Sequence, residues 1–387
     1  MPLSTLAADP FRVIGSVPRI GSLLVKPASA LCNLDCSYCF YLDRATDPYA
    51  GLQTRRMTAD TQERLVAGFL EYSYPNSTFA FQGGEPTLCG LPWFERLVDL
   101  QVSHGRSGQQ VSNAMQTNGM LIDEDWCSLF RSYNWLVGVS MDGPEAIHDQ
   151  YRRNRGGAPT WRRVMQSIEL MKKTKVEFNV LCVLSAANID KPREIYRFFR
   201  SIGVDNLQFI PLVEFGAGGE RQPYSVTPEQ YGKFLTAVFD LWWPHRKSMR
   251  IRVFDNLAEA VAGQMPGSCC LQASCDSYAV VEYNGDVYPC DFFVEGSWKL
   301  GNVAEESFAA IAKRRARMEF ASKKAIPHPK CDACEYEEIC QRGCPHTRRA
   351  QRGEFGDLDY FCESYKALYA KALRPLEVEV RHLMSRR

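Results

Sequence analysis

Short apolar runs alternate with amphipathic segments through the first two thirds of the chain, and this alternation constrains the fold more than any other feature. The apolar runs predict six strands, at 22–28, 78–84, 109–117, 135–142, 177–185 and 206–212. The segments between them predict helices at 58–73, 91–104, 123–133, 160–175 and 191–202. Strands separated by helices of this length form βα units around a parallel sheet. Six units are too few for an eight-stranded closed barrel, so we expect an α/β fold with a partial, open (β/α)6 barrel.

Unusual motifs come directly after four of the predicted strands. Three cysteines follow the first strand, QGGEP (82–86) ends the second, QTNG (116–119) ends the third and SMDGP (140–144) ends the fourth. In α/β barrels the C-terminal ends of the strands meet at one face, and reactive groups lie there. The sequence therefore predicts one active face that collects all four motifs.

The pattern changes after the sixth predicted strand. Residues 227–243 predict a helix, with Thr227 as N-cap, Pro228 in the first turn and Gln230 completing a capping box. From about residue 250 the alternation of strands and helices fades and cysteines dominate.

This change divides the chain into three expected parts. We expect an N-terminal extension at 1–20, a barrel domain at 21–248 and a cysteine-rich iron–sulfur domain at 249–387. Because the apolar runs of the last part are short, we expect metal to hold it together more than a large apolar core.

The charge and the N-terminus exclude several classes of protein. The net charge is +1, so no overall field attracts nucleic acid or an acidic membrane, and we expect neither as a partner. The Arg-rich segment 151–157 is a local exception that fits a solvated loop and an anion site equally well. No signal peptide is recognisable in the first twenty residues, and the apolar run 178–184 is too short to cross a bilayer. A cytoplasmic location is therefore predicted.

The chain has fifteen cysteines, which are out of place as disulfides in a cytoplasmic protein. In a reducing compartment, clustered cysteines are metal ligands or catalysts more often than disulfides. Three stand alone in apolar surroundings, and the other twelve fall into one group near the N-terminus and one between 269 and 362.

The N-terminal group is Cys32, Cys36 and Cys39, with the spacing C-x3-C-x2-C. A structural tetrahedral metal site needs four ligands, and this segment offers three. A cubane iron–sulfur cluster has four irons, so three cysteines would leave one iron open to an exchangeable ligand. On spacing alone, a zinc knuckle is the alternative.

The spacing after a first barrel strand, the aromatic Tyr38 before the last cysteine and the GGEP motif after the second strand together resemble the radical S-adenosylmethionine superfamily. The resemblance implies that S-adenosylmethionine binds the open iron and is cleaved to methionine and a 5′-deoxyadenosyl radical. It also implies the residues that would contact this cofactor. Gly83 and Gly84 would let the backbone approach it, Glu85 would accept from its ammonium group, Ser140 would bind the ribose, Arg152 would pair with the carboxylate, and Leu207 would pack near the adenine.

The C-terminal cysteines resemble the SPASM extension of radical enzymes that modify peptides or proteins. YNGDVY predicts a β-hairpin that could bring Cys275 and Cys290 together. The resemblance implies two further [4Fe–4S] clusters and hence three in all, with zinc as the alternative for the C-terminal sites. The implied ligands are Cys269, Cys275, Cys290 and Cys344 for one cluster, and Cys331, Cys334, Cys340 and Cys362 for the other. Cys270 is left over, and sequence alone does not choose between it and Cys269.

Across about residues 20–370 the motifs are similar to those of the anaerobic sulfatase-maturating enzymes, including LLVKPAS, FAFQGGEPTL, MQTNG, LVGVSMDGP and GDVYPCDFF. The resemblance implies oxygen-independent oxidation of a sulfatase Cys or Ser to Cα-formylglycine. Asp291 would be the catalytic base, and Tyr41 and Gln82 would line the substrate pocket. The implied partners are an unfolded or nascent sulfatase polypeptide and a low-potential electron donor of the flavodoxin or ferredoxin type.

A second hypothesis within the same superfamily is a maturase that forms a thioether or carbon–carbon crosslink in a ribosomal peptide. Such maturases often carry an N-terminal peptide-binding domain of a few dozen residues. Only about twenty residues precede the first predicted strand, which favours the sulfatase hypothesis.

Overall fold

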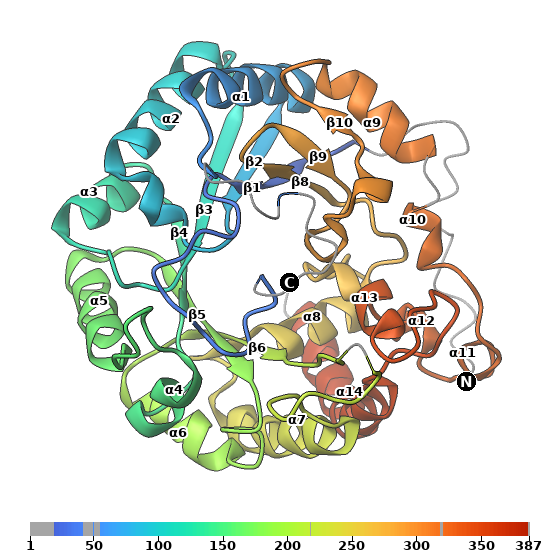
Figure 1. Ribbon diagram of the computed structural model, residues 1–387. Helices are drawn as coiled ribbons and strands as arrows, with labels where there is room; N and C mark the ends of the chain where they lie inside the picture. Colours follow the sequence, from blue (N-terminus) through green and yellow to red (C-terminus); the bar gives the residue numbers. More distant parts are fainter. Residues whose placement is uncertain (1–18, 42–48, 50–54, 217, 318–319, 386–387) are drawn as a thin grey trace.

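The structure is a computed structural model that describes residues 19–41, 49, 55–216, 218–317 and 320–385. The predicted extension at 1–20 lies almost entirely outside the described residues. Figure 1 shows a curved sheet lined on its outer side by helices, with the C-terminal helices closing the lower right of the ring.

One ten-stranded sheet runs through the molecule in the order β10-β9-β8-β1-β2-β3-β4-β5-β6-β7. Its strands are β1 (Ser22–Lys26), β2 (Asn76–Phe81), β3 (Gln110–Thr117), β4 (Leu136–Ser140), β5 (Phe178–Leu184), β6 (Asn206–Pro211), β7 (Arg250–Ile251), β8 (Tyr278–Glu282), β9 (Asp286–Tyr288) and β10 (Gly301–Asn302). Each of the six predicted strands is present, and β1 to β7 pair in parallel. The predicted partial barrel is confirmed.

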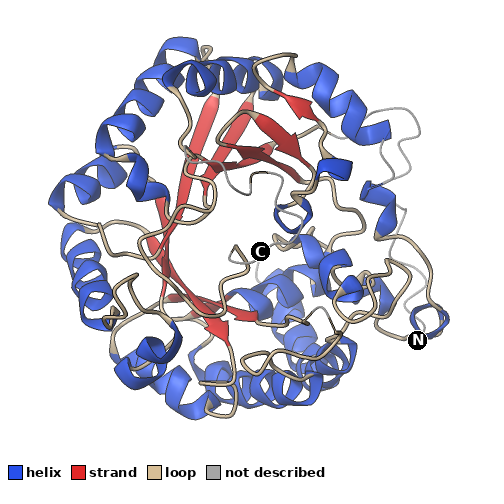
Figure 2. Cartoon of the chain, in the orientation of Figure 1, coloured by secondary structure: helices blue, strands red, loops and turns tan. Residues whose placement is uncertain are grey.

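The helices cover the outer side of this sheet (Figure 2). Those of the barrel are α1 (Ala59–Ser73), α2 (Leu91–His104), α3 (Glu124–Ser132), α4 (Glu145–Tyr151), α5 (Trp161–Thr174), α6 (Pro192–Ser201), α7 (Pro228–Trp242) and α8 (Arg252–Val261). Those of the C-terminal part are α9 (Phe308–Arg317), α10 (Phe320–Lys323), α11 (Pro329–Asp332), α12 (Glu337–Cys340), α13 (Pro345–Arg349) and α14 (Cys362–Met384). The predicted capping box at Thr227 and Gln230 is present at the start of α7.

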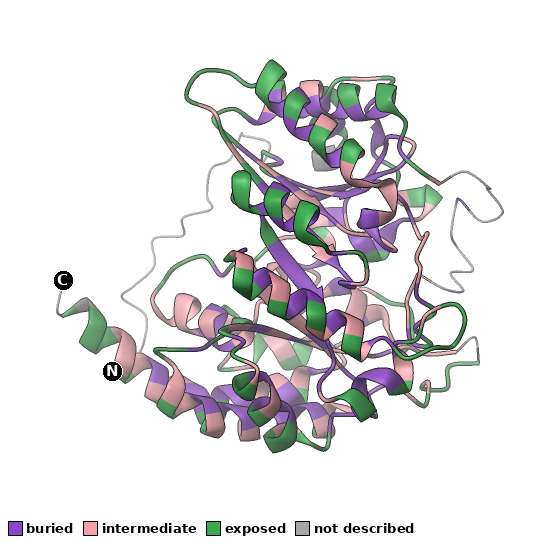
Figure 3. Cartoon of the chain, turned by 90° about the vertical axis from the view of Figure 1, so that its left-hand side faces the viewer, coloured by how far each residue is buried: buried purple, intermediate pink, exposed green. Residues whose placement is uncertain are grey.

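The core lies between the sheet and the helices, as the buried layer in Figure 3 shows. Side chains alternate between the two faces of a strand, so residues two apart share a face. Leu23 and Val25 of β1 and Phe79 and Phe81 of β2 are buried in this way. The helices turn their apolar stripe toward these residues and their exposed faces outward.

The C-terminal part differs from the sequence-based expectation, because it extends the barrel sheet and its apolar core. β8 pairs in parallel with β1, and β9 folds back on β8 as the predicted hairpin. Val280, Val281 and Val287 of this hairpin are fully buried in the same core as the barrel. The apolar run was visible in the sequence, but its pairing with β1, more than 250 residues away, was not.

None of the helices in the described ranges combines the length and the apolar character that crossing a bilayer requires.

Candidate active site

The three N-terminal cysteines lie on a loop that leaves β1 and crosses the C-terminal ends of the barrel strands. Leu34, Cys36 and Tyr38 form a small buried cluster with Leu212, the residue after β6. Burial raises the pKa of the Cys32 thiol to about 11 and that of Cys36 to about 12. Buried thiols of this kind become thiolates when a metal replaces the proton. The donor set therefore fits an iron–sulfur cluster.

Two glycines let the segment after β2 pack against this loop. An added Cβ at Gly83 would lie 2.5 Å from the carbonyl oxygen of Ser29, and one at Gly84 would lie 2.1 Å from that of Leu31. Gly84 N–H donates to Ser29 at 2.7 Å. Only glycine permits this contact. The structure thus gives these glycines a role in positioning the chain that leads to Cys32, beside the predicted cofactor contact.

Glu85 is completely buried and joins the ends of β2 and β3. Its Oε1 accepts from the amide and hydroxyl of Thr87 and from Thr117 Oγ1, and its Oε2 accepts from the Asn118 amide at 2.7 Å. Three of these donors meet at Oε1, whereas Oε2 has one donor and can accept a further one. The geometry thus favours a role in joining the GGEP and QTNG motifs, and the predicted contact with an ammonium group stays a prediction.

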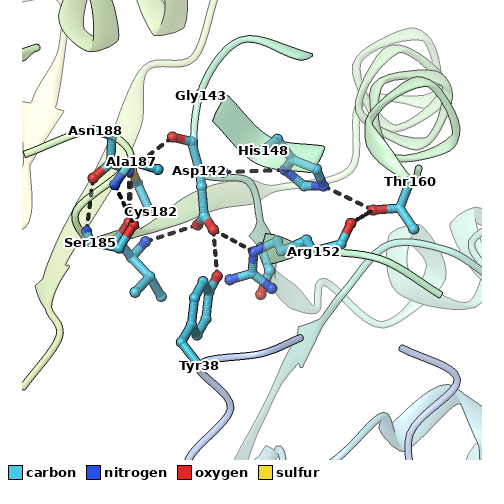
Figure 4. A network of polar contacts seen from close by, with 12 residues as sticks. Tyr38, Asp142, Gly143, His148, Arg152, Thr160, Cys182, Ser185, Ala187 and Asn188 are labelled. Atoms are coloured by element: carbon cyan, nitrogen blue, oxygen red, sulfur yellow. Dashed lines mark hydrogen bonds and ion pairs between the residues drawn. The ribbon is translucent and has the colours of Figure 1, made fainter. Parts of the chain in front are cut away.

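Asp142, two residues after β4, links the cysteine loop to the barrel (Figure 4). Its Oδ2 accepts from the Tyr38 hydroxyl and from Arg152 Nε, the latter at 2.9 Å. Its Oδ1 accepts from the Val183 amide at 3.0 Å. Sequence reasoning assigned Arg152 to the cofactor carboxylate, and the structure shows that its guanidinium is already paired with Asp142 through one of its nitrogens.

The other two predicted cofactor contacts differ in position. Ser140 ends β4 on the active face, and its hydroxyl accepts from Gln116 Nε2 at 3.0 Å. Leu207 is the second residue of β6 and packs in the main core, so it lies at the opposite end of the strand from the cysteine loop. The predicted contact of Leu207 with the adenine stays a prediction, although only the C-terminal end of β6 reaches that face. Leu212 is the leucine that lies there.

The predicted base and substrate-pocket residues, Asp291, Tyr41 and Gln82, come together in the structure, although Asp291 is more than 200 residues away from the other two along the chain. Tyr41 Oη donates to Asp291 Oδ1 at 3.0 Å, and Gln82 Nε2 lies 3.4 Å from Oδ2. Asp291 also forms an ion pair with Lys26, the last residue of β1, which is fully buried. The site therefore combines the ends of β1 and β2 with the segment after β9.

The first set of C-terminal cysteines surrounds the start of the β8–β9 hairpin. Burial raises the pKa of the Cys290 thiol to about 12, and the nearby Cys269 adds to this effect. Burial also raises the pKa of Cys344 well above its usual range, and Cys290, Cys269 and Cys270 contribute. Three of the four predicted ligands thus lie close together.

The second set lines one pocket between α12 and α14. Its walls include all four predicted ligands, Cys331, Cys334, Cys340 and Cys362, together with Tyr336 and Tyr369. Within the described ranges no three His, Cys, Asp or Glu side chains converge as ligands of a single metal ion would. The ligands of a cubane cluster bind separate irons at its corners and need not converge.

Comparison with known proteins assigns both parts of the chain. Residues 27–199 match the model of the radical SAM superfamily, and residues 270–335 match that of an iron–sulfur cluster-binding domain, SPASM. The cysteine-type anaerobic sulfatase-maturating enzyme of Clostridium perfringens is 38% identical over 361 residues, which cover 91% of this chain and 96% of that protein. The chain belongs to the anaerobic sulfatase-maturating enzymes. The serine-type anaerobic sulfatase-maturating enzyme of Bacteroides thetaiotaomicron is 34% identical, over 94% of this chain and 92% of the relative.

A solved structure supports the same assignment. Native anSMEcpe with bound AdoMet and the Cp18Cys peptide matches with a TM-score of 0.87 and 36% identity, over 94% of this chain and all of that one. The predicted fold and enzyme class are thereby confirmed, and so is the use of S-adenosylmethionine and iron–sulfur clusters. Enzymes of this family form formylglycine by radical S-adenosylmethionine chemistry.

Sequence reasoning missed three residues that shape the active site of this sulfatase-maturating enzyme. Lys26 and Glu282 form a buried ion pair beside Asp291, and Asp142 fixes Tyr38 and Arg152. A lysine at the end of the apolar run SLLVK was the available signal for Lys26. Asp142 belongs to the motif SMDGP, but its role was not predictable because its partners lie on other strands and loops.

Proposed function

We propose that this chain oxidises a Cys or Ser of a sulfatase polypeptide to Cα-formylglycine without oxygen, with Asp291 as the catalytic base. The observation that carries this assignment is the meeting of Asp291 with Tyr41 and Gln82 at the edge where the barrel joins the β8–β9 hairpin. The fixed position of Asp291, directly after Cys290, supports it.

The reaction defines what such a base must do. The substrate Cβ loses a hydrogen atom, the thiol or hydroxyl loses a proton, and one electron leaves to an acceptor, so that a thioaldehyde or aldehyde results. When bound, S-adenosylmethionine and its cluster supply the radical that removes the hydrogen atom. A carboxylate within hydrogen-bond reach of the substrate heteroatom is suited to take the proton. Tyr41 and Gln82 would hold the Asp291 carboxylate and the peptide beside each other.

Other residues would hold the cofactors. Cys32, Cys36 and Cys39 would bind the cluster that carries S-adenosylmethionine, and the eight C-terminal cysteines described above would bind the two auxiliary clusters. Ser140 would contact the ribose, and the part of the Arg152 guanidinium not used by Asp142 would pair with the carboxylate. Gly83 and Gly84 would bring the backbone close to the cofactor, with Glu85 fixing their loop.

The partners follow from this chemistry. The substrate would be an unfolded or nascent sulfatase polypeptide, because its target residue must reach a buried carboxylate. A donor of the flavodoxin or ferredoxin type would reduce the cluster, and the reaction would take place in the cytoplasm. The named curated relatives are sulfatase-maturating enzymes, which favours this substrate over a crosslinked ribosomal peptide.

Anaerobic incubation of the reconstituted, reduced protein with a peptide carrying C-x-P-x-R tests the proposal. Conversion to formylglycine should lower the mass by about 18 Da for a Cys peptide and by about 2 Da for the Ser peptide. A crosslinked product, which loses hydrogen but keeps its sulfur, would contradict the proposal for the Cys peptide.

A further inference from the structure

Lys26 lies at the seam where the barrel meets the C-terminal hairpin. It is the last residue of β1, and its Cα partner across the parallel β1–β8 pair is Glu282, the last residue of β8. Figure 1 shows these two strands side by side near the centre of the sheet. Lys26 Nζ lies 3.5 Å from Glu282 Oε1 and forms a second ion pair with Asp291 Oδ1.

Lys26, Glu282 and Asp291 are all buried, so their relative positions are tightly constrained. Lys26 is 0% exposed, Glu282 3% and Asp291 6%. Burying an ammonium group lowers the free energy of unfolding by several kcal/mol, in order of magnitude, unless carboxylates and hydrogen bonds compensate for the lost hydration. Two carboxylates supply that compensation, Glu282 at the end of β8 and Asp291 in the segment after β9. The position of either carboxylate is therefore tied to the Lys26 ammonium group.

The ammonium group also lies beside the predicted substrate pocket. Its Nζ is 4.8 Å from the centre of the Tyr41 ring, within the range of a cation–π contact. Tyr41 and Lys26 both contact Asp291 Oδ1, whereas Gln82 lies on the side of Oδ2. The contacts of Tyr41 and Lys26 with Oδ1 fix the orientation of the Asp291 carboxylate.

We propose that Lys26 is a positioning residue for the oxidation reaction, which holds the Asp291 carboxylate in the orientation that the substrate requires. The proposal rests on the assignment of Asp291 as the base. A misplacement of about 1 Å in a reacting group can lower a rate by about 10²-fold. Loss of the Lys26 ammonium group therefore affects formation of formylglycine more than cleavage of S-adenosylmethionine. The cysteine loop is held independently of Lys26, by the Tyr38–Asp142 hydrogen bond and by the Glu85 amide, which donates to the Leu31 carbonyl at 2.8 Å.

The double variant Lys26→Met/Glu282→Gln tests this, because it removes one positive and one negative charge and leaves the buried charge balance unchanged. We expect the amount of formylglycine formed per 5′-deoxyadenosine to fall about 10²-fold. The kcat for formylglycine formation should fall, and the KM for the peptide should stay unchanged. Iron content and peptide affinity should match those of the unsubstituted protein. Lys299→Met is the matched control, since Lys299 pairs with Asp286 in the same hairpin at 2.6 Å but is 40% exposed. It should leave the product ratio unchanged.

An unchanged product ratio in the double variant would overturn the proposal. If the double variant loses its iron, Lys26→Arg replaces it, because a planar guanidinium cannot reproduce the place of the ammonium group between two carboxylates. A fall of about tenfold in the ratio is then expected, and no fall would overturn the proposal. Asp291→Asn, measured in parallel, separates the two claims: if it too keeps the ratio, the base assignment fails, and if it alone lowers the ratio, only the role of Lys26 fails.

Discussion

Asp142 accepts a hydrogen bond from Arg152 Nε at 2.9 Å, and this buried ion pair joins the end of β4 to the loop that follows α4. The same carboxylate holds Tyr38, which lies between two of the cysteines predicted to bind the cluster (Figure 4). The cysteine loop is thus fixed from the side of the barrel.

Asp142→Asn should lower the free energy of unfolding by about 3 kcal/mol or more, because it leaves the buried Arg152 without its anionic partner. The midpoint of thermal unfolding measures this. Asp60→Asn is the control, since Asp60 and Arg64 form an exposed pair at 3.0 Å that should matter little. Equal midpoints for the two variants would contradict the role given to Asp142.

His148 should make stability depend on pH. Burial lowers its pKa to about 4, from an ordinary value of 6.5. Its Nδ1 accepts from the Asp142 amide at 3.3 Å, so the neutral ring is the form that fits. Between these two pKa values the unfolded chain binds more protons than the folded one. The free energy of unfolding should therefore fall as the pH falls below about 6.5, by at most about 1.4 kcal/mol per pH unit.

Unfolding curves between about pH 5.5 and 7.5 test this dependence. His148→Gln should reduce the slope of stability against pH, whereas His104→Gln, at an exposed position on α2, should leave it as it is. The same slope in the protein and in His148→Gln would show that other groups cause the acid sensitivity.

The reconstituted protein should contain three [4Fe–4S] clusters, or about twelve irons per chain. Replacing Cys32, Cys36 and Cys39 together by Ala should leave about eight irons and abolish cleavage of S-adenosylmethionine. Metal analysis of both proteins gives the count. Zinc in place of iron at the C-terminal cysteines would defeat this prediction.

Asp291→Asn should separate the two products of the reaction. The substitution keeps the size of the side chain and removes its basicity, and loss of a general base typically costs 10²- to 10⁴-fold in rate. We expect 5′-deoxyadenosine to form while formylglycine falls by about that factor. Chromatography of both products measures the ratio. Formylglycine at close to the unsubstituted rate would mean that another group is the base, and loss of 5′-deoxyadenosine as well would indicate a structural role beside Cys290.

The sequence carried most of the fold because its signals are local. The period of the apolar residues identified six strands, and the Thr227–Gln230 capping box marked the start of α7. The hairpin was also predictable, because YNGDVY is a local turn signal. Its Gly285 has a φ of +89° in the turn, a conformation that favours glycine. The pairing of β8 with β1 has no local signal, because a parallel pair between distant segments depends only on the packing of the whole chain.

The site residues that belong to recognisable sequence motifs could be predicted. Asp291, Tyr41 and Gln82 were found by resemblance, and the structure brings them together. A motif does not say how far along its strand a residue lies: Leu207 is near the start of β6, whose C-terminal end faces the cysteine loop. The Lys26 ion pairs were not predicted, because Lys26, Glu282 and Asp291 come from segments that are distant along the chain.

The most direct test of the account is label transfer from a C-x-P-x-R peptide that carries deuterium at the Cβ of its target cysteine. If the radical removes hydrogen from this carbon, the deuterium should appear in 5′-deoxyadenosine in proportion to the formylglycine that forms. Formylglycine accompanied by unlabelled 5′-deoxyadenosine would contradict the account.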